Sequence, residues 1–185
     1  MVGVVGSNPI APTNAETGPC GPRFSFRELH RRWHDCPSKA RVCTGNICRS
    51  PIGEALLSAR LAEAGLDVRV ESAGIGAVVG AGAHEYSKEV MAPWNVSLEA
   101  HIARQFDASL ATPFELILAL DSGHKEWIGR RFPELSGRTF RLGHWLDEDI
   151  VDPIGRPVED FRLSRDHIDR AIDAWFERFG IKKAT

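Results

Sequence analysis

The chain has 185 residues, enough for one domain with a modest extension, and 43% of them are hydrophobic, enough for a packed core. Its formal net charge of −2 gives no electrostatic reason to expect binding to nucleic acid or to an anionic membrane. No apolar run approaches the roughly 20 residues that a membrane span needs. The 4 cysteines, none of them after Cys48, do not form the disulfide framework of a secreted domain. We therefore expect a soluble, cytoplasmic protein.

Residues 1–37 differ in composition from the rest of the chain. Residues 1–22 are rich in Gly, Pro, Asn and Thr and lack periodicity, which predicts disorder. Residues 24–34 have apolar side chains spaced for one face of a helix. We expect either an arm that binds a partner or a start codon assigned too far upstream, followed by one domain over residues 38–185.

Strands and helices alternate along residues 38–185, which predicts an α/β domain with a parallel sheet covered by helices on both faces. The patterns predict strands at 38–42, 67–72, 114–120 and 139–142, and helices at 50–64, 85–94, 122–132 and 158–179. The first strand carries Lys39 and Arg41, which a central strand buried on both faces should not contain. A long loop, 143–157, precedes the last helix.

The stretch Val-Cys-Thr-Gly-Asn-Ile-Cys-Arg-Ser-Pro, residues 42–51, predicts the end of a strand, a tight loop and the start of a helix. Gly45 and Asn46 tolerate the left-handed backbone that such a loop needs. Ser50 suits the helix cap, and the proline after it suits the first helical position. The loop N–H groups would then point at a helix N-terminus, where the dipole favours an anion.

Cys43 and Arg49 stand at the two ends of this loop. A cysteine in such a field, beside a fixed guanidinium, is expected to have a lowered pKa and to be a thiolate at neutral pH. The loop N–H groups and Arg49 would hold the oxygens of a phosphate while the sulfur attacks phosphorus. The alternative is a zinc knuckle or a structural pair with Cys48, but no second Cys/His pair follows at finger spacing. The residues thus suggest phosphoryl transfer through a phosphocysteine.

The motif, and the sequence from about Arg41 to the end of the chain, resemble the low-molecular-weight protein tyrosine phosphatases. The resemblance implies a three-layer fold with a four-stranded parallel sheet, hydrolysis of phosphotyrosine, and no cofactor or metal. Arg49 and the backbone would supply the positive field that magnesium supplies elsewhere. The matching phosphate-binding loop consists of Thr44, Gly45, Asn46, Ile47, Cys48 and Ser50.

The family's general acid lies in an Asp-Pro pair, which here matches Asp152 and the proline after it. One carboxyl group would protonate the departing phenolate and then activate water. Asp149 is the alternative acid, although no proline follows it, and an isolated Asp-Pro is otherwise an ordinary turn. The family places aromatic residues around the substrate ring, where this chain has Val78 and Ile154, so we expect an apolar wall with less stacking.

Ser72 and His101, together with Asn46 and Ser50, match residues that hold the family's loop in shape. Asp121 follows a predicted strand at the edge where α/β domains bind ligands, and is a secondary candidate. Cys48 is either a small buried residue or a redox partner of the nucleophile.

Three other functions share parts of this pattern. Arsenate reductases have the same loop but need further cysteines, which this chain lacks after Cys48, and phosphoarginine phosphatases carry a smaller polar residue where Ile47 stands. A non-catalytic phosphate-binding module would not need Cys43, Arg49 and Asp152 together. Residues 71–80 and 142–145 resemble bacterial phosphatases paired with exopolysaccharide or capsule tyrosine kinases. The tyrosine-rich tail of such a kinase is therefore the implied partner, without nucleic acid or membrane insertion.

Overall fold

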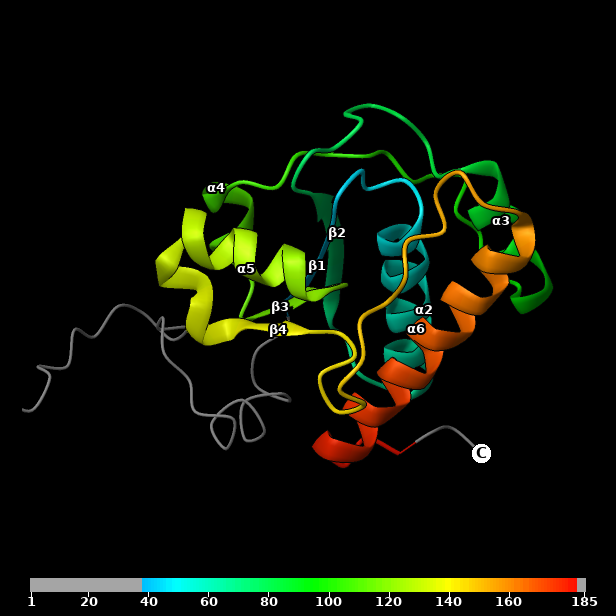
Figure 1. The fold of residues 1–185 in the computed structure, drawn as a ribbon. Coiled ribbons are helices and arrows are strands. Elements are labelled where there is room, and N and C mark those ends of the chain that lie inside the picture. The colour runs from blue at the N-terminus through cyan, green and yellow to red at the C-terminus, as the bar shows by residue number, and fades with distance from the viewer. Residues whose placement is uncertain (1–37, 183–185) are drawn as a thin grey trace, which may run out of the picture.

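The computed structural model describes the backbone of residues 38–182 and the side chains from Thr44 onward (Figure 1). The helix expected at residues 24–34 lies outside the described residues. The strands are β1 (Ser38–Cys43), β2 (Arg69–Gly74), β3 (Leu116–Ala119) and β4 (Thr139–Arg141). The helices are α2 (Arg49–Glu63), α3 (Glu85–Met91), α4 (Ala108–Ala111), α5 (Ser122–Arg131) and α6 (Val158–Phe179). Two 3₁₀ segments, η1 (Ala92–Trp94) and η2 (Pro133–Arg138), complete the described elements.

Within residues 38–182 the strands form one sheet in the order β2-β1-β3-β4, and every neighbouring pair is parallel. The interior strands are β1 and β3, and Val42 of β1 pairs with Ala73 of β2 and Ala119 of β3. Because the strands are parallel, their carboxyl ends and the loops that follow them share one edge of the sheet. The predicted α/β class is confirmed.

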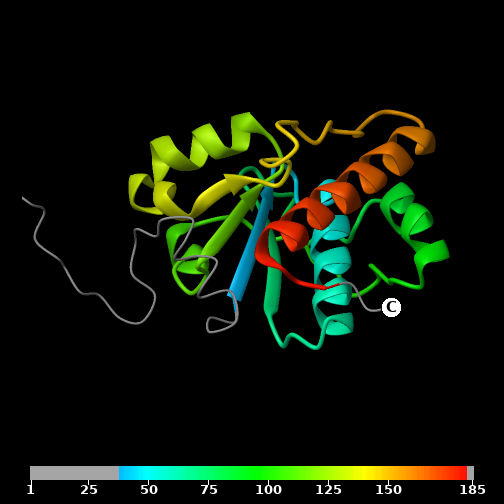
Figure 2. The same ribbon diagram turned by 90° about the horizontal axis from the view of Figure 1, so that it is seen from below.

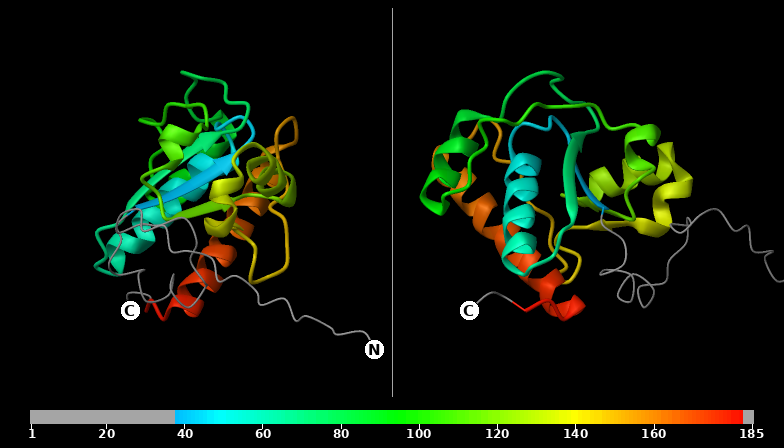
Figure 3. Two further views of the ribbon diagram at one scale, coloured as in Figure 1. Left: turned by 90° about the vertical axis from the view of Figure 1, so that its left-hand side faces the viewer. Right: turned by 180° about the vertical axis from the view of Figure 1, so that it is seen from behind.

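Helices cover both faces of the sheet. Helices α2, α3 and α6 lie on one side, and α4 and α5 lie on the other (Figures 1, 2 and 3). The buried strand β3 divides the core: Leu116 and Leu118 pack toward α2 and α6, while Ile117 packs with Phe114 and Ile128 on the side of α5. This burial on both faces explains the unbroken apolar run in the sequence.

The long helices follow the apolar pattern closely. Helix α6 has the predicted bounds, and its expected stripe of Ile168, Ile172, Trp175 and Phe179 is buried. Trp175 also donates a hydrogen bond from Nε1 to the carbonyl oxygen of Leu142, 2.6 Å away, which ties α6 to the segment after β4. None of the helices in the described part of the chain has the length and apolar character required to span a bilayer.

Local capping differs from the expectation at the start of α2. The helix begins at Arg49, its N-cap is Cys48, and no side chain caps it. Ser50 is therefore not the cap, and Pro51 occupies the third helical position rather than the first. The hydroxyl of Ser50 instead accepts a hydrogen bond from the Asn46 side chain, so it serves the loop rather than the helix end.

Some other elements also differ from the expectation, and β2 lies two residues later than the strand expected at 67–72. The helix expected at 85–94 stops at Met91 and continues as the 3₁₀ segment η1, which contains Pro93. Helix α4 and the 3₁₀ segment η2 were not predicted, since elements of four and six residues are too short for a helical period to be visible.

Candidate active site

The loop between β1 and α2 turns its carbonyl oxygens outward, toward surrounding segments. Five successive carbonyl oxygens, those of residues 44–48, have partners there. The partners, in order along the loop, are Gly76 N–H (3.0 Å), Val78 N–H (3.0 Å), His101 Nε2 (2.7 Å), His84 N–H (2.8 Å) and Ser87 Oγ (3.3 Å).

This arrangement fixes the direction of the N–H groups. A trans peptide holds its C=O and the following N–H on opposite sides, and no described peptide bond is cis. The N–H groups of residues 45–49 therefore point toward the inside of the loop, at the N-terminus of α2. Converging N–H groups at a helix N-terminus form an anion site.

Asn46 is the residue that closes the loop. Its φ is 58°, a left-handed conformation, and it is fully buried. Gly45 does not have a positive φ, so the expectation that both residues adopt left-handed backbone was wrong for Gly45. An asparagine in this conformation persists only if its surroundings hold it.

A chain of side-chain hydrogen bonds supplies that support. Asn46 Nδ2 donates to Ser50 Oγ at 2.9 Å and to Ser72 Oγ at 2.8 Å, and Ser72 in turn donates to Glu54 Oε2 at 2.5 Å. Asn46 Oδ1 accepts from the Arg104 backbone N–H at 2.9 Å, which sets the orientation of the amide. The structure thus brings Asn46, Ser50 and Ser72 together, and His101 joins them through the Asn46 carbonyl oxygen.

Arg49, the first residue of α2, is only 3% exposed. Its Nη1 donates to Asp121 Oδ2 at 2.9 Å and to the Ile150 carbonyl oxygen at 2.6 Å. Its Nη2 donates to Asp152 Oδ2 at 2.6 Å. The guanidinium is therefore fixed at the end of the loop by segments that follow β3 and β4.

Asp121 caps α5 and carries the ion pair with Arg49. Burial alone would raise the pKa of its carboxyl group. The nearby His124 ring and backbone N–H and the bond from Arg49 outweigh burial, and the pKa lies well below the ordinary value. Asp121 is thus a stable anion in the folded protein.

Asp152 is the carboxylate of the late loop that pairs with this guanidinium, and a tight turn orients it. Its Oδ1 accepts from the Ile154 N–H at 3.1 Å, and Arg156 N–H bonds back to the Pro153 carbonyl oxygen at 3.0 Å. Gly155 has a φ of 74°, which this turn requires. Asp152 is about one third exposed (37%), so it can reach both the loop and solvent.

The alternative acid, Asp149, faces a different group. It accepts hydrogen bonds from the backbone N–H (3.0 Å) and Oγ (2.6 Å) of Ser122, and it pairs with Arg141 at 3.0 Å. Burial would raise its pKa, but these partners lower it below the ordinary value. Among the described side chains, only Asp121 and Asp152 form ion pairs with Arg49, so the geometry favours Asp152 over Asp149 as the acid.

A family model described as "Low molecular weight phosphotyrosine protein phosphatase" matches residues 40–184. The chain belongs to this family. It is 41% identical over 137 residues to the probable low molecular weight protein-tyrosine-phosphatase EpsP of Ralstonia nicotianae, covering 74% of this chain and 92% of that protein. It is 40% identical over 138 residues to the phosphatase Etp of Escherichia coli K12, covering 74% of this chain and 90% of Etp.

Solved structures of low molecular weight phosphatases have the same fold. The tyrosine phosphatase AmsI of Erwinia amylovora superposes with a TM-score of 0.72 at 34% identity, covering 77% of this chain and 92% of that chain. The YwlE arginine phosphatase of Geobacillus stearothermophilus superposes with a TM-score of 0.71 at 35% identity, covering 78% and 93%.

In this low molecular weight phosphatase, the residues expected to form a substrate wall are exposed. Val78 is 52% and Ile154 is 51% exposed, and both belong to segments that border the phosphate-binding loop. The Val78 N–H bonds to the Gly45 carbonyl oxygen, and the N–H of Ile154 bonds to the Asp152 carboxylate. Exposed apolar side chains at such positions are suited to contact an aryl ring.

The two cysteines of the motif occupy different places. Cys43 is the last residue of β1, paired with Gly74 of β2, at the carboxyl edge of the sheet. Cys48 is buried in the core, 5% exposed, beside the start of α2. Among the described side chains, no group of three or more His, Cys, Asp or Glu is placed to hold a metal ion.

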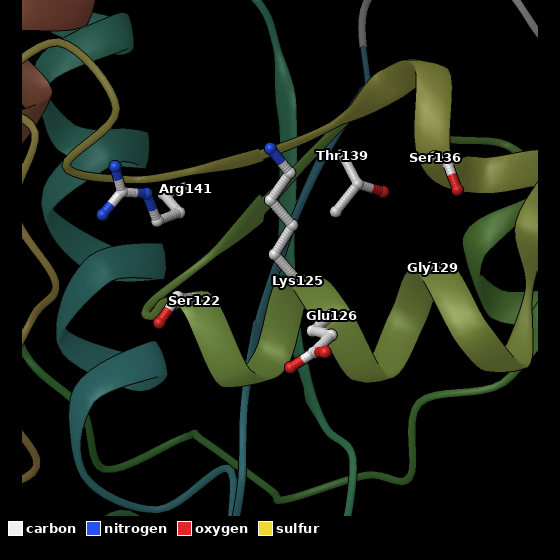
Figure 4. Close-up of a pocket in the computed structure, with 7 residues that line it drawn as sticks. All are labelled: Ser122, Lys125, Glu126, Gly129, Ser136, Thr139 and Arg141. Carbon is white, nitrogen blue, oxygen red and sulfur yellow. The ribbon is translucent and has the colours of Figure 1, made fainter.

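A pocket of about 350 Å³ lies next to the site, between α5 and β4 (Figure 4). Its lining residues are Ser122, Lys125, Glu126, Gly129, Ser136, Thr139 and Arg141. Figure 4 shows Lys125 extending from α5 toward β4, while Glu126 points away from that strand. Asp149 bonds to two of the lining residues, Ser122 and Arg141, and the lining contains none of the predicted site residues.

Several residues that support the loop were not predicted from the sequence. Glu54 ends the hydrogen-bond chain through Ser72, Arg104 orients Asn46, and His124 Nε2 lies 2.8 Å from Thr44 Oγ1. Glu54 and His124 lie within predicted helices and Arg104 in a predicted connection. A single polar residue at such a position gives no signal that distinguishes it from a solvated side chain.

Proposed function

We propose that this protein hydrolyses phosphotyrosine in proteins through a phosphocysteine intermediate on Cys43. The observation that carries the proposal is the loop with five outward carbonyl oxygens, which directs N–H groups 45–49 to one point beside Arg49. These donors match the oxygens of a tetrahedral phosphoryl group, and they are fixed before the substrate arrives.

In the first step, the N–H groups and Arg49 bind the phosphate dianion, and the Cys43 thiolate attacks phosphorus in line. The sulfur–phosphorus bond forms while the bond from phosphorus to the tyrosine oxygen breaks. Asp152 donates its proton to the departing phenolate. Because Asp152 Oδ2 accepts from Arg49 Nη2, an incoming phosphate oxygen would take over that donor and free the carboxylate to take up a proton from solvent, which it then passes to the phenolate.

In the second step, Asp152 accepts a proton from water as the water oxygen attacks phosphorus. The sulfur–phosphorus bond breaks, and inorganic phosphate and the Cys43 thiolate are formed. The N-terminus of α2 stabilises the thiolate as it leaves. The hydroxyl of Ser50, whose oxygen accepts from Asn46, has a proton that it can donate toward the same sulfur.

The apolar residues around the loop favour an aryl ester as the substrate. Val78 and Ile154 would pack on the phenol ring, and Ile47 occupies the position where phosphoarginine phosphatases carry a smaller polar residue. Phosphoarginine is the second candidate substrate, because YwlE arginine phosphatases are also among the solved structures with this fold.

We further propose a bacterial tyrosine kinase of exopolysaccharide synthesis as the physiological partner. The support is the resemblance of residues 71–80 and 142–145 to phosphatases paired with such kinases, and the similarity to EpsP, Etp and AmsI. The proposal requires the cytoplasm, where ATP-dependent kinases phosphorylate their tails. It also takes residues 38–185 as the phosphatase domain, with a three-layer, four-stranded architecture, and residues 1–37 as an extension to it.

The test is hydrolysis of an aryl phosphate between pH 5 and 8 in the presence of a chelator. We expect turnover by the wild type, none by Cys43→Ser, and retained turnover by the matched variant Cys48→Ser. Absence of turnover in a folded wild type would contradict the proposal and favour a phosphate-binding module.

Substrate choice needs a separate comparison. We expect higher kcat/KM for a phosphotyrosine peptide than for a phosphoarginine peptide. We also expect a phosphorylated kinase tail to exceed a phosphotyrosine peptide of random sequence. Equal rates for the last two would remove the kinase from the proposal without affecting the chemistry.

A further inference from the structure

His124 is a buried histidine that the proposed mechanism does not use. It lies in the first turn of α5 and is 2% exposed. Its Nε2 lies 2.8 Å from Thr44 Oγ1. Its Nδ1 lies 2.8 Å from Asp121 Oδ1, off the direction of an ideal hydrogen bond, and its backbone N–H donates to the same oxygen at 2.8 Å.

The two partners of this ring belong to opposite ends of the phosphate-binding loop. Thr44 is the first residue after the nucleophile Cys43. Asp121 accepts a hydrogen bond from Arg49, the last residue of the loop, at 2.9 Å. If His124 were buried only for packing, any two polar groups could serve as partners of its ring. Its partners instead connect both ends of the phosphate-binding loop to helix α5.

The direction of the hydrogen bonds follows from the charges. The Asp121 carboxylate can only accept, so the imidazole beside it is oriented to carry its proton on Nδ1. Nε2 is then an acceptor, and the Thr44 hydroxyl donates to it. This bond fixes the side chain of Thr44, while the Gly76 N–H fixes its carbonyl oxygen at 3.0 Å.

We propose that His124 is a positioning residue of the phosphatase reaction, which aligns Thr44 and, through Asp121, Arg49 around the transferring phosphoryl group. The inference rests on the proposed function. We expect His124 to stabilise the transition state more than the bound substrate. Small displacements of N–H donors and of the nucleophile weaken catalysis more than they weaken substrate binding.

The test compares variants that remove one partner of the hydrogen bond between Thr44 and His124 with variants that preserve this bond. Thr44→Val removes the hydroxyl at constant shape, and Thr44→Ser restores it. His124→Asn has its amide near the Nδ1 position, and His124→Gln near the Nε2 position, so only Gln reaches Thr44. The matched control is Thr112→Val, whose hydroxyl donates only to the Ala108 carbonyl oxygen in α4 among the described groups.

We expect Thr44→Val and His124→Asn each to lower kcat for an aryl phosphate about tenfold, with KM changed less than about twofold. Thr112→Val should stay within about threefold of the wild type, and Thr44→Ser and His124→Gln should recover most of the kcat that Thr44→Val and His124→Asn lose. The double variant Thr44→Val/His124→Asn should be no slower than the slower single variant, because both changes break one connection.

Three results would overturn the inference. One is unchanged kcat in Thr44→Val and His124→Asn with only a lowered melting temperature, which would assign His124 to folding alone. Another is a double variant whose loss equals the product of the single losses. The third is equal loss in His124→Gln and His124→Asn.

Failure of the proposed function would be seen separately, as absence of turnover in the wild type. In that case, calorimetric titration with orthovanadate, whose trigonal-bipyramidal form resembles the transferring phosphoryl group, replaces kcat. Weaker vanadate binding by Thr44→Val than by Thr112→Val would support the positioning of the loop, and equal binding would contradict it.

Discussion

Arg49 forms ion pairs with two carboxylates that have different roles. Asp121 and the Ile150 carbonyl oxygen both accept hydrogen bonds from Nη1. Because Asp121 also caps α5, its contact with Arg49 belongs to the scaffold. Asp152 holds Nη2 from a loop and is more exposed. A bound phosphate can replace Asp152 at Nη2 without disturbing the support that Asp121 gives to Nη1.

Asp152→Asn tests this division of roles. The asparagine amide cannot act as a general acid. We therefore expect kcat to fall by about 10²- to 10³-fold, within the usual range for general acid catalysis. Inorganic phosphate should inhibit the variant at least as strongly as the wild type, because a negative charge that competes for Arg49 is removed. Steady-state kinetics with orthophosphate as a competitive inhibitor measures both effects.

Asp149→Asn is the matched control for that experiment. Asp149 lies in the same loop, but its partners are Ser122 and Arg141. We expect its kcat to stay within about threefold of the wild type. A loss as large as that of Asp152→Asn would transfer the acid role to Asp149 and contradict the assignment drawn from the geometry.

The sequence was informative about the loop because few roles require these residue types in this order. A buried asparagine with positive φ needs fixed hydrogen-bond partners, and the family resemblance pointed to Ser50, Ser72 and His101, which bond to it. The prediction that Ser50 caps α2 was wrong because its hydroxyl is used by Asn46. His124 and Glu54 could not be found, since their roles depend on contacts between segments distant in sequence.

At the scale of elements, the end of β2 and the phosphate-binding loop are packed backbone to backbone. A Cβ atom built on Gly74 would lie 2.4 Å from the Thr44 carbonyl oxygen and 3.0 Å from the Asn46 nitrogen. Gly74 also exchanges backbone hydrogen bonds with the segment after residue 103, from its N–H to Arg104 O and from Phe106 N–H to its O. The strand cannot move away from the loop without breaking these bonds.

Gly74→Ala should therefore displace the loop. We expect a destabilisation of about 1–3 kcal/mol, as for other changes that overpack a rigid site, together with a loss of kcat. Gly76→Ala is the matched control in the same segment, because its added Cβ would meet nothing within 4 Å and its φ is not positive. Urea unfolding and aryl phosphate hydrolysis measure the two effects, and equal behaviour of the two variants would contradict the proposed close packing.

The alternation of strands and helices made the class of the fold predictable from the sequence. The short elements could not be predicted. The period of α6 and the apolar run of β3 reflect burial that extends along the whole element. Helix α4 has only four residues, and its cap at Asp107 resembles any polar turn in the sequence. Propensity over so few residues is too weak to compete with tertiary contacts.

Across the whole molecule, the parallel sheet collects the site at one edge. Cys43 ends β1, Gly74 ends β2, and Asp121 follows the segment of β3, while the loop with Asp152 follows β4. This clustering could be predicted, because parallel strands place their carboxyl ends together. The ion pairs that connect these segments could not, since they depend on side-chain positions that no single segment determines.

These ion pairs make the stability of the molecule dependent on pH. Asp121 and Asp149 both have a pKa below the ordinary value in the folded protein. A carboxylate with a depressed pKa stabilises the fold fully above its unfolded pKa, about 3.9, and this contribution is lost as the pH falls toward the folded pKa. The melting temperature should therefore be nearly constant around neutral pH and should fall below about pH 4.

Asp121→Asn isolates the largest of these contributions. Asparagine can still cap α5, so the substitution removes mainly the negative charge of Asp121, which faces Arg49 and the His124 ring. At pH 7 we expect a loss of about 1–2 kcal/mol, which lowers the melting temperature by about 3–6 °C for a domain of this size. Asp67→Asn, at an exposed position, is the control and should change the melting temperature little at any pH.

The decisive feature is how the difference between wild type and Asp121→Asn varies with pH. As the pH falls from about 5 to 3, the unfolded wild type begins to protonate Asp121 while the variant has no group to protonate, so the two melting curves should converge. Calorimetric scans at intervals of half a pH unit measure this convergence. A difference that stays constant from pH 7 to 3 would mean that Asp121 stabilises the molecule through shape and hydrogen bonding, and that its charge does not link the phosphate-binding loop to α5.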